Sequence, residues 1–545
     1  MKLLIVAPHF PPTHVGGVES VALSHADWMH RAGHEVEVVC VEGLVDTGSV
    51  SAENDTRGAY TIHRLRLGIG GQDFRLLHTH DAQRDWFDAL IGARRPDVLH
   101  VHSGYLTGAP ALAAASARAV PTVLTLHDYW FICPRITLLQ PDGSCCSGPE
   151  AAKCAWCLRT EQRRFLWADR ATAGVAGQVG RRLARASLAG TSALNRVQTR
   201  NDHLRSLLLA TDLVLSPSDF LRSLMIDAGF PGDRIRTHVT GIAPLPPWQR
   251  SRQGDDPIHI GYAGRLVEPK GVHVLIDAVR ALPFDNWTLA IHGPTDVDPR
   301  YVARLRSLAA GDARIQFAGP FPADQQSRVF ADLDALVVPS VWYENRPLII
   351  LEAQSAGLPV IASKLGGMAE LIEHGRTGLL FQPGDAHDLV RQLTVVRHDA
   401  TLAESLAAER SRVMTIPREM ASLESLYVQL RSARDKARSS RSGSRRPSAG
   451  ARARLAPRPV NAGADRPIKD RSPGLHHDAS QAPDTDQRSD AKHARDDRCQ
   501  PRGSAAGGHR RRGVGIAAAA AGGHRGGEPR RRRRWWRGGA RAPDP

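Results

Sequence analysis

Residues 258–271 read IHIGYAGRLVEPKG. A strand-length apolar run ends at a glycine, a short loop carrying Arg265 and Lys270 follows, and a helix-length segment begins after Gly271. Similar apolar runs recur along the chain, and helix-length segments separate them. They lie at residues 3–6, 36–39, 98–101 and 122–125, and again at 258–262, 288–291, 315–317, 335–338 and 359–362. Strands that are apolar on both faces and alternate with helices predict parallel sheets covered by helices.

The proline-rich stretch 243–257 interrupts this alternation once. We therefore expect an α/β protein with two Rossmann-like, doubly wound domains that face each other. The predicted domains are 1–241, with a cysteine-rich insertion at 133–157, and 242–405. We expect residues 406–436 to be helical and to pack back against the first domain.

The positive charge is concentrated at the end of the chain. Residues 435–545 hold 27 Lys and Arg against 11 Asp and Glu, which accounts for the whole net charge of +16. This region is rich in Arg, Gly, Ala and Pro and has few long apolar side chains, so it cannot bury enough surface to offset its ordering entropy. We interpret residues 437–545 as a disordered basic tail. We favour a solvated tail over one that binds phosphate backbones or a membrane, and nucleic acid is not an expected partner.

Cysteine use and hydropathy bear on the compartment. The apolar run 2–7 is too short for a signal peptide or a membrane span, and no other run reaches spanning length. Five of the seven cysteines cluster at 133–157, unlike a secreted disulfide framework. We expect a cytoplasmic protein. The Arg-rich stretch 159–205 is consistent with contact to anionic lipid at the inner face of the membrane, and equally with a solvated helix surface.

Two loops have the composition of phosphate-binding sites. The segment 8–19 carries Gly16 and Gly17 shortly before a helix predicted to begin at Ser20, and glycine amides can approach a phosphate closely. A tight strand-to-helix turn explains these glycines equally well. Arg265 and Lys270 place two cations at a helix amino terminus, where the helix dipole already favours anions, so we predict that they bind a diphosphate.

The segment ENRPLIILE (344–352) supplies a pair of carboxylates. With Pro347 at the start of a helix, Glu344 lies just outside it and Glu352 on its second turn. Such a pair can hold the two ends of one ligand. Alone, the spacing is weak evidence, because caps and solvated helix faces often carry glutamate.

Together these elements resemble the retaining nucleotide-sugar glycosyltransferases of family four, which have the GT-B fold. The resemblance also includes His127 in TLHDYW (125–130) and the segment LGGMAELI (365–372), and it covers residues 1 to about 430 in family order. It implies catalytic roles for His127, Arg265, Lys270 and Glu344. It implies that the donor is bound by Gly16, Gly17, Arg265, Lys270, Glu344, Leu348 and Glu352.

By this resemblance, Glu352 holds the donor ribose and Glu344 the transferred sugar, while His127 lies near the sugar and the acceptor. Many members have Phe-Gly where this chain has Arg346-Pro347, so the donor identity stays open between a UDP-sugar and a GDP-sugar. The expected acceptor is a saccharide or a lipid-linked saccharide.

The reaction builds negative charge on the leaving diphosphate, so positioned cations should be the largest catalytic contribution. No carboxylate is an obvious nucleophile, which favours same-face substitution with retention of configuration. No catalytic metal is expected. A nucleotide-sugar epimerase or phosphorylase on the same fold and a non-catalytic scaffold that binds through the tail are the alternatives.

The cysteines suggest a structural metal. Cys133, Cys154, Cys157 and one of Cys145 or Cys146 have the residue types of a tetrahedral zinc site, and we expect Cys146 to be the fourth ligand. An iron–sulfur cluster and ordinary free thiols are the alternatives.

Overall fold

The structure is a computed structural model. It describes residues 1–46, 48–57, 60–69, 78–160, 192–248, 256–399 and 413–443, together with residues 172, 175, 177, 179 and 405. Residues 444–545, which make up nearly all of the predicted tail, lie outside the described residues, as do most residues of 161–191 within the Arg-rich stretch 159–205.

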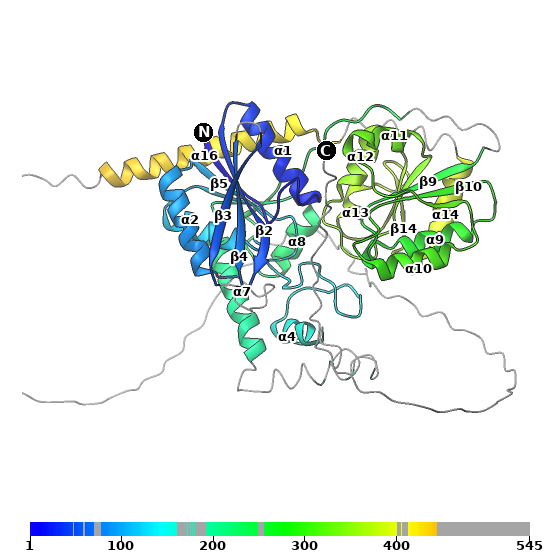
Figure 1. The fold of residues 1–545 in the computed structure, drawn as a ribbon, viewed down its shortest axis with the longest axis horizontal. Helices are drawn as coiled ribbons and strands as arrows, with labels where there is room; N and C mark the ends of the chain where they lie inside the picture. The colour runs from blue at the N-terminus through cyan, green and yellow to red at the C-terminus, as the bar shows by residue number, and fades with distance from the viewer. Residues whose placement is uncertain are drawn as a thin grey trace, which may run out of the picture. The chain divides into compact units, whose positions relative to one another are not determined.

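The first half of the chain forms an eight-stranded sheet in the order β3-β4-β2-β1-β5-β6-β7-β8 (Figure 1). Its strands are β1 (Lys2–Val6), β2 (Glu35–Val45), β3 (Val50–Arg57), β4 (Tyr60–Gly68), β5 (Val98–His102), β6 (Thr122–Thr125), β7 (Leu213–Ser216) and β8 (Ile235–Thr237). All pairings are parallel except that of β3 with β4. The sequence analysis did not predict β3, because this edge strand is polar and exposed and lacks the apolar pattern of the inner strands.

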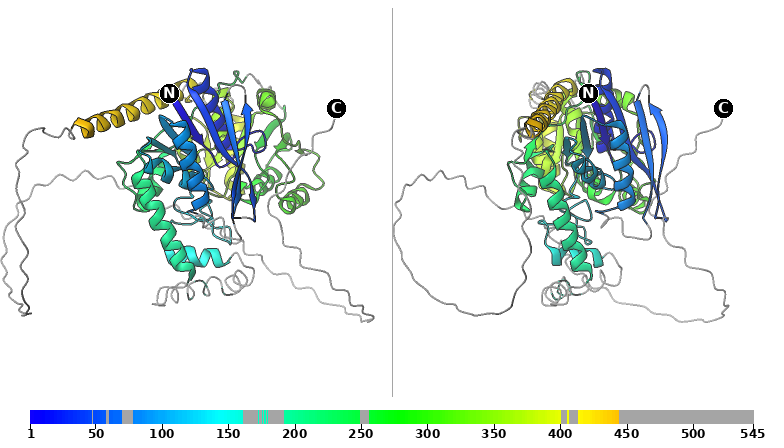
Figure 2. Two further views of the ribbon diagram at one scale, coloured as in Figure 1. Left: turned by 60° about the vertical axis from the view of Figure 1, so that its left-hand side comes forward. Right: turned by 90° about the vertical axis from the view of Figure 1, so that its left-hand side faces the viewer.

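Helices cover both faces of this sheet. The helices of this half are α1 (Gly17–Arg31), α2 (Asp81–Arg94), α3 (Gly108–Ala117), α4 (Ala151–Thr160), α7 (Ser192–Ala210) and α8 (Asp219–Asp227). α4 lies beside α7, away from the strands (Figure 2). The predicted helix at Ser20 begins three residues earlier, at Gly17.

The second half forms a six-stranded sheet in the order β11-β10-β9-β12-β13-β14, and all of its pairings are parallel. Its strands are β9 (Ile258–Ala263), β10 (Trp287–His292), β11 (Ile315–Phe317), β12 (Ala335–Val338), β13 (Val360–Ser363) and β14 (Leu379–Phe381). Its helices are α9 (Val272–Arg280), α10 (Pro299–Ala309), α11 (Gln326–Ala331), α12 (Leu348–Ala356), α13 (Gly366–Leu371) and α14 (Ala386–His398), with 3-10 turns η2 (Glu268–Lys270) and η3 (Ala323–Gln325). The predicted class, two doubly wound α/β sheets, is confirmed.

The helix α16 (Ile416–Gly443) follows the second sheet in sequence but packs on the first. Its residues Met420, Leu423 and Tyr427 are fully buried in one apolar cluster with Leu3 and Val98 from the first sheet. Within the described part of the chain, no helix combines the length and hydropathy needed to cross a membrane.

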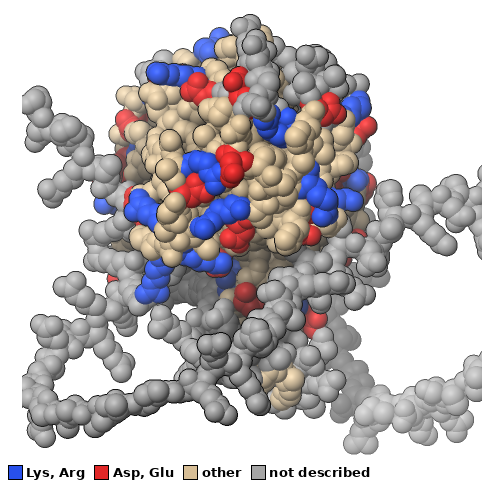
Figure 3. All heavy atoms as spheres, turned by 90° about the vertical axis from the view of Figure 1, so that its right-hand side faces the viewer, with Lys and Arg blue, Asp and Glu red and all other residues tan. Residues whose placement is uncertain are grey.

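Charges are interspersed on the face of the molecule shown in Figure 3, where lysine and arginine alternate with aspartate and glutamate. This agrees with the formal neutrality of residues 1–434.

Candidate functional site

In each sheet, the order in which successive strands are added changes direction at one strand. β1 lies between β2 and β5, and β9 lies between β10 and β12. Ligands of doubly wound sheets bind at the carboxyl ends of the strands around such a point. The loops after β1 and β9 carry Gly16, Gly17, Arg265 and Lys270, and the loop after β12 carries Glu344.

Lys270 and Glu344 form an ion pair in which Lys270 Nζ lies 2.7 Å from Glu344 Oε1. The same carboxylate oxygen accepts hydrogen bonds from Ser340 Oγ and Trp342 Nε1, both at 2.8 Å. The backbone N–H of Val341 donates to the carbonyl of Pro269, which ties the loop after β12 to the loop after β9. These contacts fix one carboxylate oxygen and leave Oε2 of Glu344 outside this set of bonds.

The pKa of Glu344 is lowered. Burial alone would raise it, but the positive charge of Lys270 and the hydrogen bonds from Lys270, Ser340 and Trp342 outweigh burial. Glu344 is therefore a carboxylate at neutral pH, and it neutralises Lys270 locally.

Two glycine positions allow this packing. Gly271 has φ +69°, and a Cβ there would lie 1.9 Å from the carbonyl oxygen of Pro339. A Cβ on Gly367 would lie 1.6 Å from the carbonyl oxygen of Asn345, and its N–H donates to the carbonyl of Glu344. The segment 365–372 thus supports the backbone of Glu344 by close approach.

Arg265 differs from Lys270 in its surroundings. Its side chain is exposed, and among the described residues its guanidinium forms no hydrogen bond or ion pair. Its charge acts on Glu19 of α1, whose pKa burial raises and the charges of His14 and Arg265 partly lower. Arg265 is therefore a cation without a dedicated carboxylate partner among the described residues, next to the amino end of α1. We call the parts built around the first and the second sheet the first and the second lobe.

The two glycines before α1 have different surroundings. A Cβ on Gly16 would meet Glu19 Oε2 at 2.6 Å, whereas a Cβ on Gly17 would meet no atom within 4 Å. Gly17 is the first residue of α1, so its N–H is one of those without a partner inside the helix. This leaves open space beside a helix amino terminus.

Glu352 lies on the second turn of α12 and is half-buried. Its Oε2 accepts a hydrogen bond from Gln326 Nε2 at 2.6 Å. Burial raises the pKa of Glu352, and Gln326 partly opposes this rise. Leu348 is the first residue of α12 and is half-buried. Pro347 is the N-cap, so the helix begins one residue later than predicted.

His127 follows β6 and is half-buried. Its Nε2 lies 2.9 Å from Nδ1 of His102, and the two rings stack. Burial, together with the charge of His25, lowers the pKa of His127 to about 3. His127 is therefore a neutral imidazole held through Nε2, and it suits hydrogen bonding better than charge compensation.

Behind His127 lies a buried histidine cluster, which consists of His25, His100 and His102. One potential ligand atom from each ring lies within 4.8 Å of the others. His100 is held at both nitrogens, by the hydroxyls of Tyr427 and Thr125, and His25 Nε2 lies 3.1 Å from Glu419 Oε1. These bonds link β5 and α1 to α16, so the cluster anchors the terminal helix.

Asn345 joins the two lobes beside the site. Its Nδ2 donates to the carbonyls of Leu126 and His127, both at 3.2 Å, and its Oδ1 accepts from Ser218 Oγ at 2.6 Å. Since Asn345 follows Glu344 directly, this contact brings the chain at Glu344 to the chain at His127.

The sequence analysis missed the partners of the predicted residues: Ser340, Trp342, Gln326 and Asn345. Two of them lie two and four positions before Glu344 and Asn345 lies one after it, so proximity in sequence was an available signal. Gln326 comes from another helix, and nothing in the sequence connects it to Glu352.

Comparison with known proteins gives two family matches. Residues 15–185 match the family described as "Glycosyltransferase Family 4", and residues 257–399 match "Glycosyl transferases group 1". The glycogen synthase of Mycobacterium tuberculosis is 26% identical over 441 residues, which are 76% of this chain and 90% of that protein.

Solved structures share the fold. The sucrose-phosphate synthase of Thermosynechococcus elongatus superposes with a TM-score of 0.56 at 17% identity, over 79% of this chain and 99% of that one. Anabaena HepE in complex with UDP-glucose superposes with a TM-score of 0.52 at 18% identity, over 79% of this chain and 100% of that one.

Proposed function

Because this chain belongs to the family-four, group 1 glycosyltransferases, which are retaining and depend on nucleotide sugars, we propose that it transfers a hexose from a UDP-sugar or GDP-sugar to a saccharide or lipid-linked saccharide. The observation that carries the proposal is the ion pair of Lys270 with Glu344 beside the exposed Arg265. This arrangement combines a fixed carboxylate for hydroxyl groups with a cation that has no carboxylate of its own. UDP is the first donor nucleotide to test, since HepE was solved with UDP-glucose.

The donor spans the second lobe in this proposal. Glu352 accepts hydrogen bonds from the ribose hydroxyls, and Leu348 packs beside the nucleoside at the start of the same helix. Glu344 Oε2, which its protein partners leave outside their bonds, accepts from hydroxyls of the sugar. Gly16 and Gly17 let the first lobe approach the diphosphate, and the Gly17 N–H donates to it.

Cations stabilise the departure of the nucleoside diphosphate. The bond from the anomeric carbon to the diphosphate oxygen breaks, and the electron pair stays on that oxygen. Arg265 and Lys270 offset the developing negative charge, and preorganised charges of this kind give large rate effects. The acceptor hydroxyl attacks from the same face and gives its proton to a departing phosphate oxygen, which retains the configuration.

His127 orients a hydroxyl group of the sugar or the acceptor and does not supply a positive charge. A neutral ring held by His102 through Nε2 can present Nδ1 to a hydroxyl of the sugar or the acceptor. Removal of His127 should therefore reduce turnover more than it reduces nucleotide binding.

A thermal-shift panel of nucleotides and nucleotide sugars tests the donor assignment. A ligand that binds only the folded state at 100 times its Kd stabilises it by about 2.7 kcal/mol. We expect UDP or GDP to raise the Tm of the wild type, and the Glu352→Ala variant to lose this rise. Glu373→Ala, an exposed carboxylate of the same lobe that pairs with Arg376, is the matched control and should respond like the wild type.

An undiminished nucleotide shift in Glu352→Ala would contradict the ribose assignment. Incubation of the bound donor without acceptor tests the reaction itself. We expect at most slow hydrolysis, and an isomerised sugar in the mixture would favour an epimerase.

A further inference from the structure

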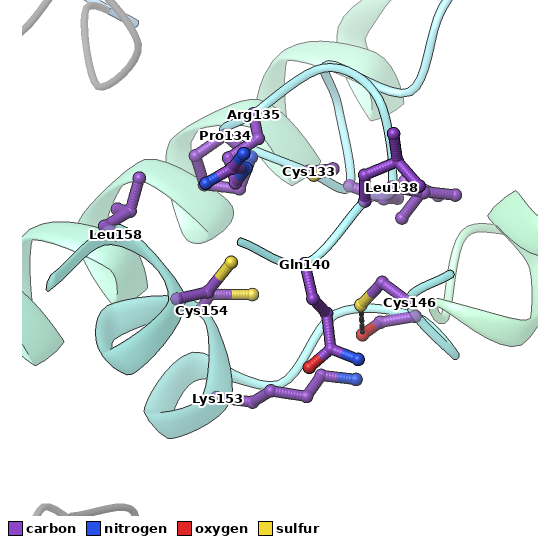
Figure 4. Close-up of a pocket in the computed structure, with 13 residues that line it drawn as sticks. Cys133, Pro134, Arg135, Leu138, Gln140, Cys146, Lys153, Cys154 and Leu158 are labelled. Atoms are coloured by element: carbon purple, nitrogen blue, oxygen red, sulfur yellow. Dashed lines mark hydrogen bonds between the residues drawn. The ribbon is translucent and has the colours of Figure 1, made fainter. Parts of the chain in front are cut away.

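Four cysteine thiols line one cavity in the loop that follows β6. Cys133 and Cys146 come from that loop, and Cys154 and Cys157 come from α4. Figure 4 shows Cys133, Cys146 and Cys154 on different walls of the cavity. Cys133 and Cys154 are buried, and the other two are half-buried. Four such ligands, with a Cys-x-x-Cys pair on one helix, match the composition of a structural zinc site.

The structure separates Cys146 from its neighbour Cys145. Cys146 faces the cavity, and its Sγ lies 3.4 Å from the carbonyl of Gly148. Cys145 does not line the cavity, and its Sγ lies 3.6 Å from the carbonyl of Val341 in the second lobe. The thiol set is therefore Cys133, Cys146, Cys154 and Cys157.

Among the described residues, α4 has little apolar core to hold it. The buried part of the cluster that joins α4 to α7 consists of Cys154, Ala155 and Val197. A helix with so small a buried face gains little from packing. A metal bound to two thiols of α4 and two of the loop would join the helix to the loop.

A buried guanidinium next to the thiols is a second, independent observation. Arg200 of α7 is fully buried, and its Nε and Nη1 have no hydrogen-bond partner. Its Nη2 donates to the carbonyl of Trp130, and among the described residues it forms no ion pair with a carboxylate. Asp128 lies near enough to interact by charge, but its oxygens accept from Ser103 and from the Trp130 N–H. A buried charge without a close counterion is costly, so an anion is expected near it.

Two of the thiols, Cys133 and Cys154, lie close enough to Arg200 to act on its charge. Burial lowers the pKa of Arg200 to about 10, and the nearby Cys133 and Cys154 oppose this. Four thiolates in this space need a cation among them, and Arg200 needs negative charge beside it.

We propose that Cys133, Cys146, Cys154 and Cys157 bind one zinc ion as thiolates and that Arg200 offsets the negative charge of this centre. Four S–Zn bonds form, and the four thiol protons leave to solvent. Four thiolates and Zn²⁺ carry a net charge of −2, which a buried guanidinium partly neutralises. No oxidation or reduction takes part.

The four thiols must move closer together to bind one ion. Among the described residues, three or more potential ligand atoms lie within 4.8 Å of one another in the histidine cluster, but not in the thiol cavity. However, both nitrogens of His100 already have partners, so a metal there would break a hydrogen bond to Tyr427 or Thr125. At the thiol cavity, deprotonation removes only the weak hydrogen bond from Cys146 Sγ to the carbonyl of Gly148 among the bonds described above, and we expect zinc binding to contract the cavity.

The test uses the full chain, purified under reducing conditions without metal-affinity chromatography or chelators. We expect about one zinc per chain by elemental analysis, release of that zinc on titration with an organomercurial, and a thiolate-to-metal charge-transfer band when Co²⁺ replaces it. Cys154→Ser/Cys157→Ser should lose the metal, whereas Cys145→Ser and Cys40→Ser are matched controls that should keep it. Arg200→Met should lose zinc to a competing chelator at least tenfold faster than the wild type.

The wild-type protein alone can overturn the zinc site, whatever the variants do. Less than a tenth of an equivalent of zinc, with no uptake of added Zn²⁺ by the reduced chain, would refute it. Iron with acid-labile sulfide in place of zinc would refute it too, as would metal loss in Cys145→Ser equal to that in Cys154→Ser/Cys157→Ser. An unchanged zinc-transfer rate in a folded Arg200→Met variant would remove the role of Arg200.

Discussion

Removal of the Lys270 ammonium should destabilise the protein, because Glu344 is buried and depends on it. Lys270 Nζ lies 2.7 Å from Glu344 Oε1, and the two side chains are 21% and 9% exposed. At this distance and an effective dielectric of about 20, the attraction is on the order of 6 kcal/mol before the cost of desolvation. Breaking a buried pair by removing one partner typically costs about 3–5 kcal/mol. Since Lys270 is partly exposed, we expect Lys270→Met to lower the free energy of unfolding by about 3 kcal/mol.

The stability loss in Lys270→Met should depend on pH through the ionisation of Glu344. In the wild type the folded-state pKa of Glu344 lies below its ordinary value of 4.5, so its contribution is present above that value and is lost as the pH falls through the folded pKa. In the Lys270→Met variant, the lysine charge no longer offsets the effect of burial on Glu344. The pKa of Glu344 in the folded state should therefore rise above its value in the unfolded state. The variant's deficit should therefore be large at pH 7 and small near pH 4.

Urea denaturation at pH 7 and pH 4 measures this effect. The variants are Lys270→Met, Glu344→Gln, the double variant, and Arg265→Met as the matched cation without a carboxylate partner. We expect the double variant to recover about 2 kcal/mol relative to the sum of the single losses, and Arg265→Met to unfold like the wild type. The reasoning fails if Lys270→Met and Arg265→Met have equal midpoints, or if the deficit at pH 4 equals that at pH 7.

Four further predictions concern packing, donor approach and the contacts of the terminal helix. Gly367→Ala should cost at least about 2 kcal/mol of unfolding free energy, because the added Cβ would lie 1.6 Å from the carbonyl oxygen of Asn345. Gly17→Ala should unfold like the wild type, because no atom lies within 4 Å of the added Cβ, and it should weaken only nucleotide binding in the thermal-shift assay. Tyr427→Phe should cost about 1–3 kcal/mol in urea denaturation, because it leaves a buried histidine nitrogen without its partner. The pKa of Glu419 is lowered, because the neighbouring histidines and a hydrogen bond from a backbone amide outweigh the opposing effect of burial. The wild type should therefore be more stable than Glu419→Gln at neutral pH, and this advantage should vanish on acidification.

Much of the fold was predictable because inner parallel strands have a strong sequence pattern. The runs at 98–101 and 258–262 are apolar on both faces, and both form central strands. The edge strand β3 carries Glu53, Asn54 and Asp55 in the open, and only its pairing with β4 makes it a strand. Side-chain periodicity contains no information about a partner supplied by another segment.

The sequence analysis named candidate residues for the site but could not predict their pairings. Arg265 and Lys270 are five positions apart and both basic, yet Lys270 binds Glu344 and Arg265 has no such partner among the described residues. This difference arises from the loop after β12, which reaches Lys270 only when β9 and β12 are neighbours in the sheet. Sheet order is a long-range property, and the two cations therefore look equivalent in sequence.

Consecutive residues form the contact between the lobes and the proposed sugar site. Glu344 faces Lys270, and Asn345 holds the carbonyls of Leu126 and His127. A shift of the Asn345 backbone is passed on to Glu344, because one planar peptide unit joins the two residues. The amide of Asn345 does not titrate, so the contact makes the same hydrogen bonds at every pH at which the protein is folded. We therefore expect this contact to contribute nothing to the pH dependence of turnover.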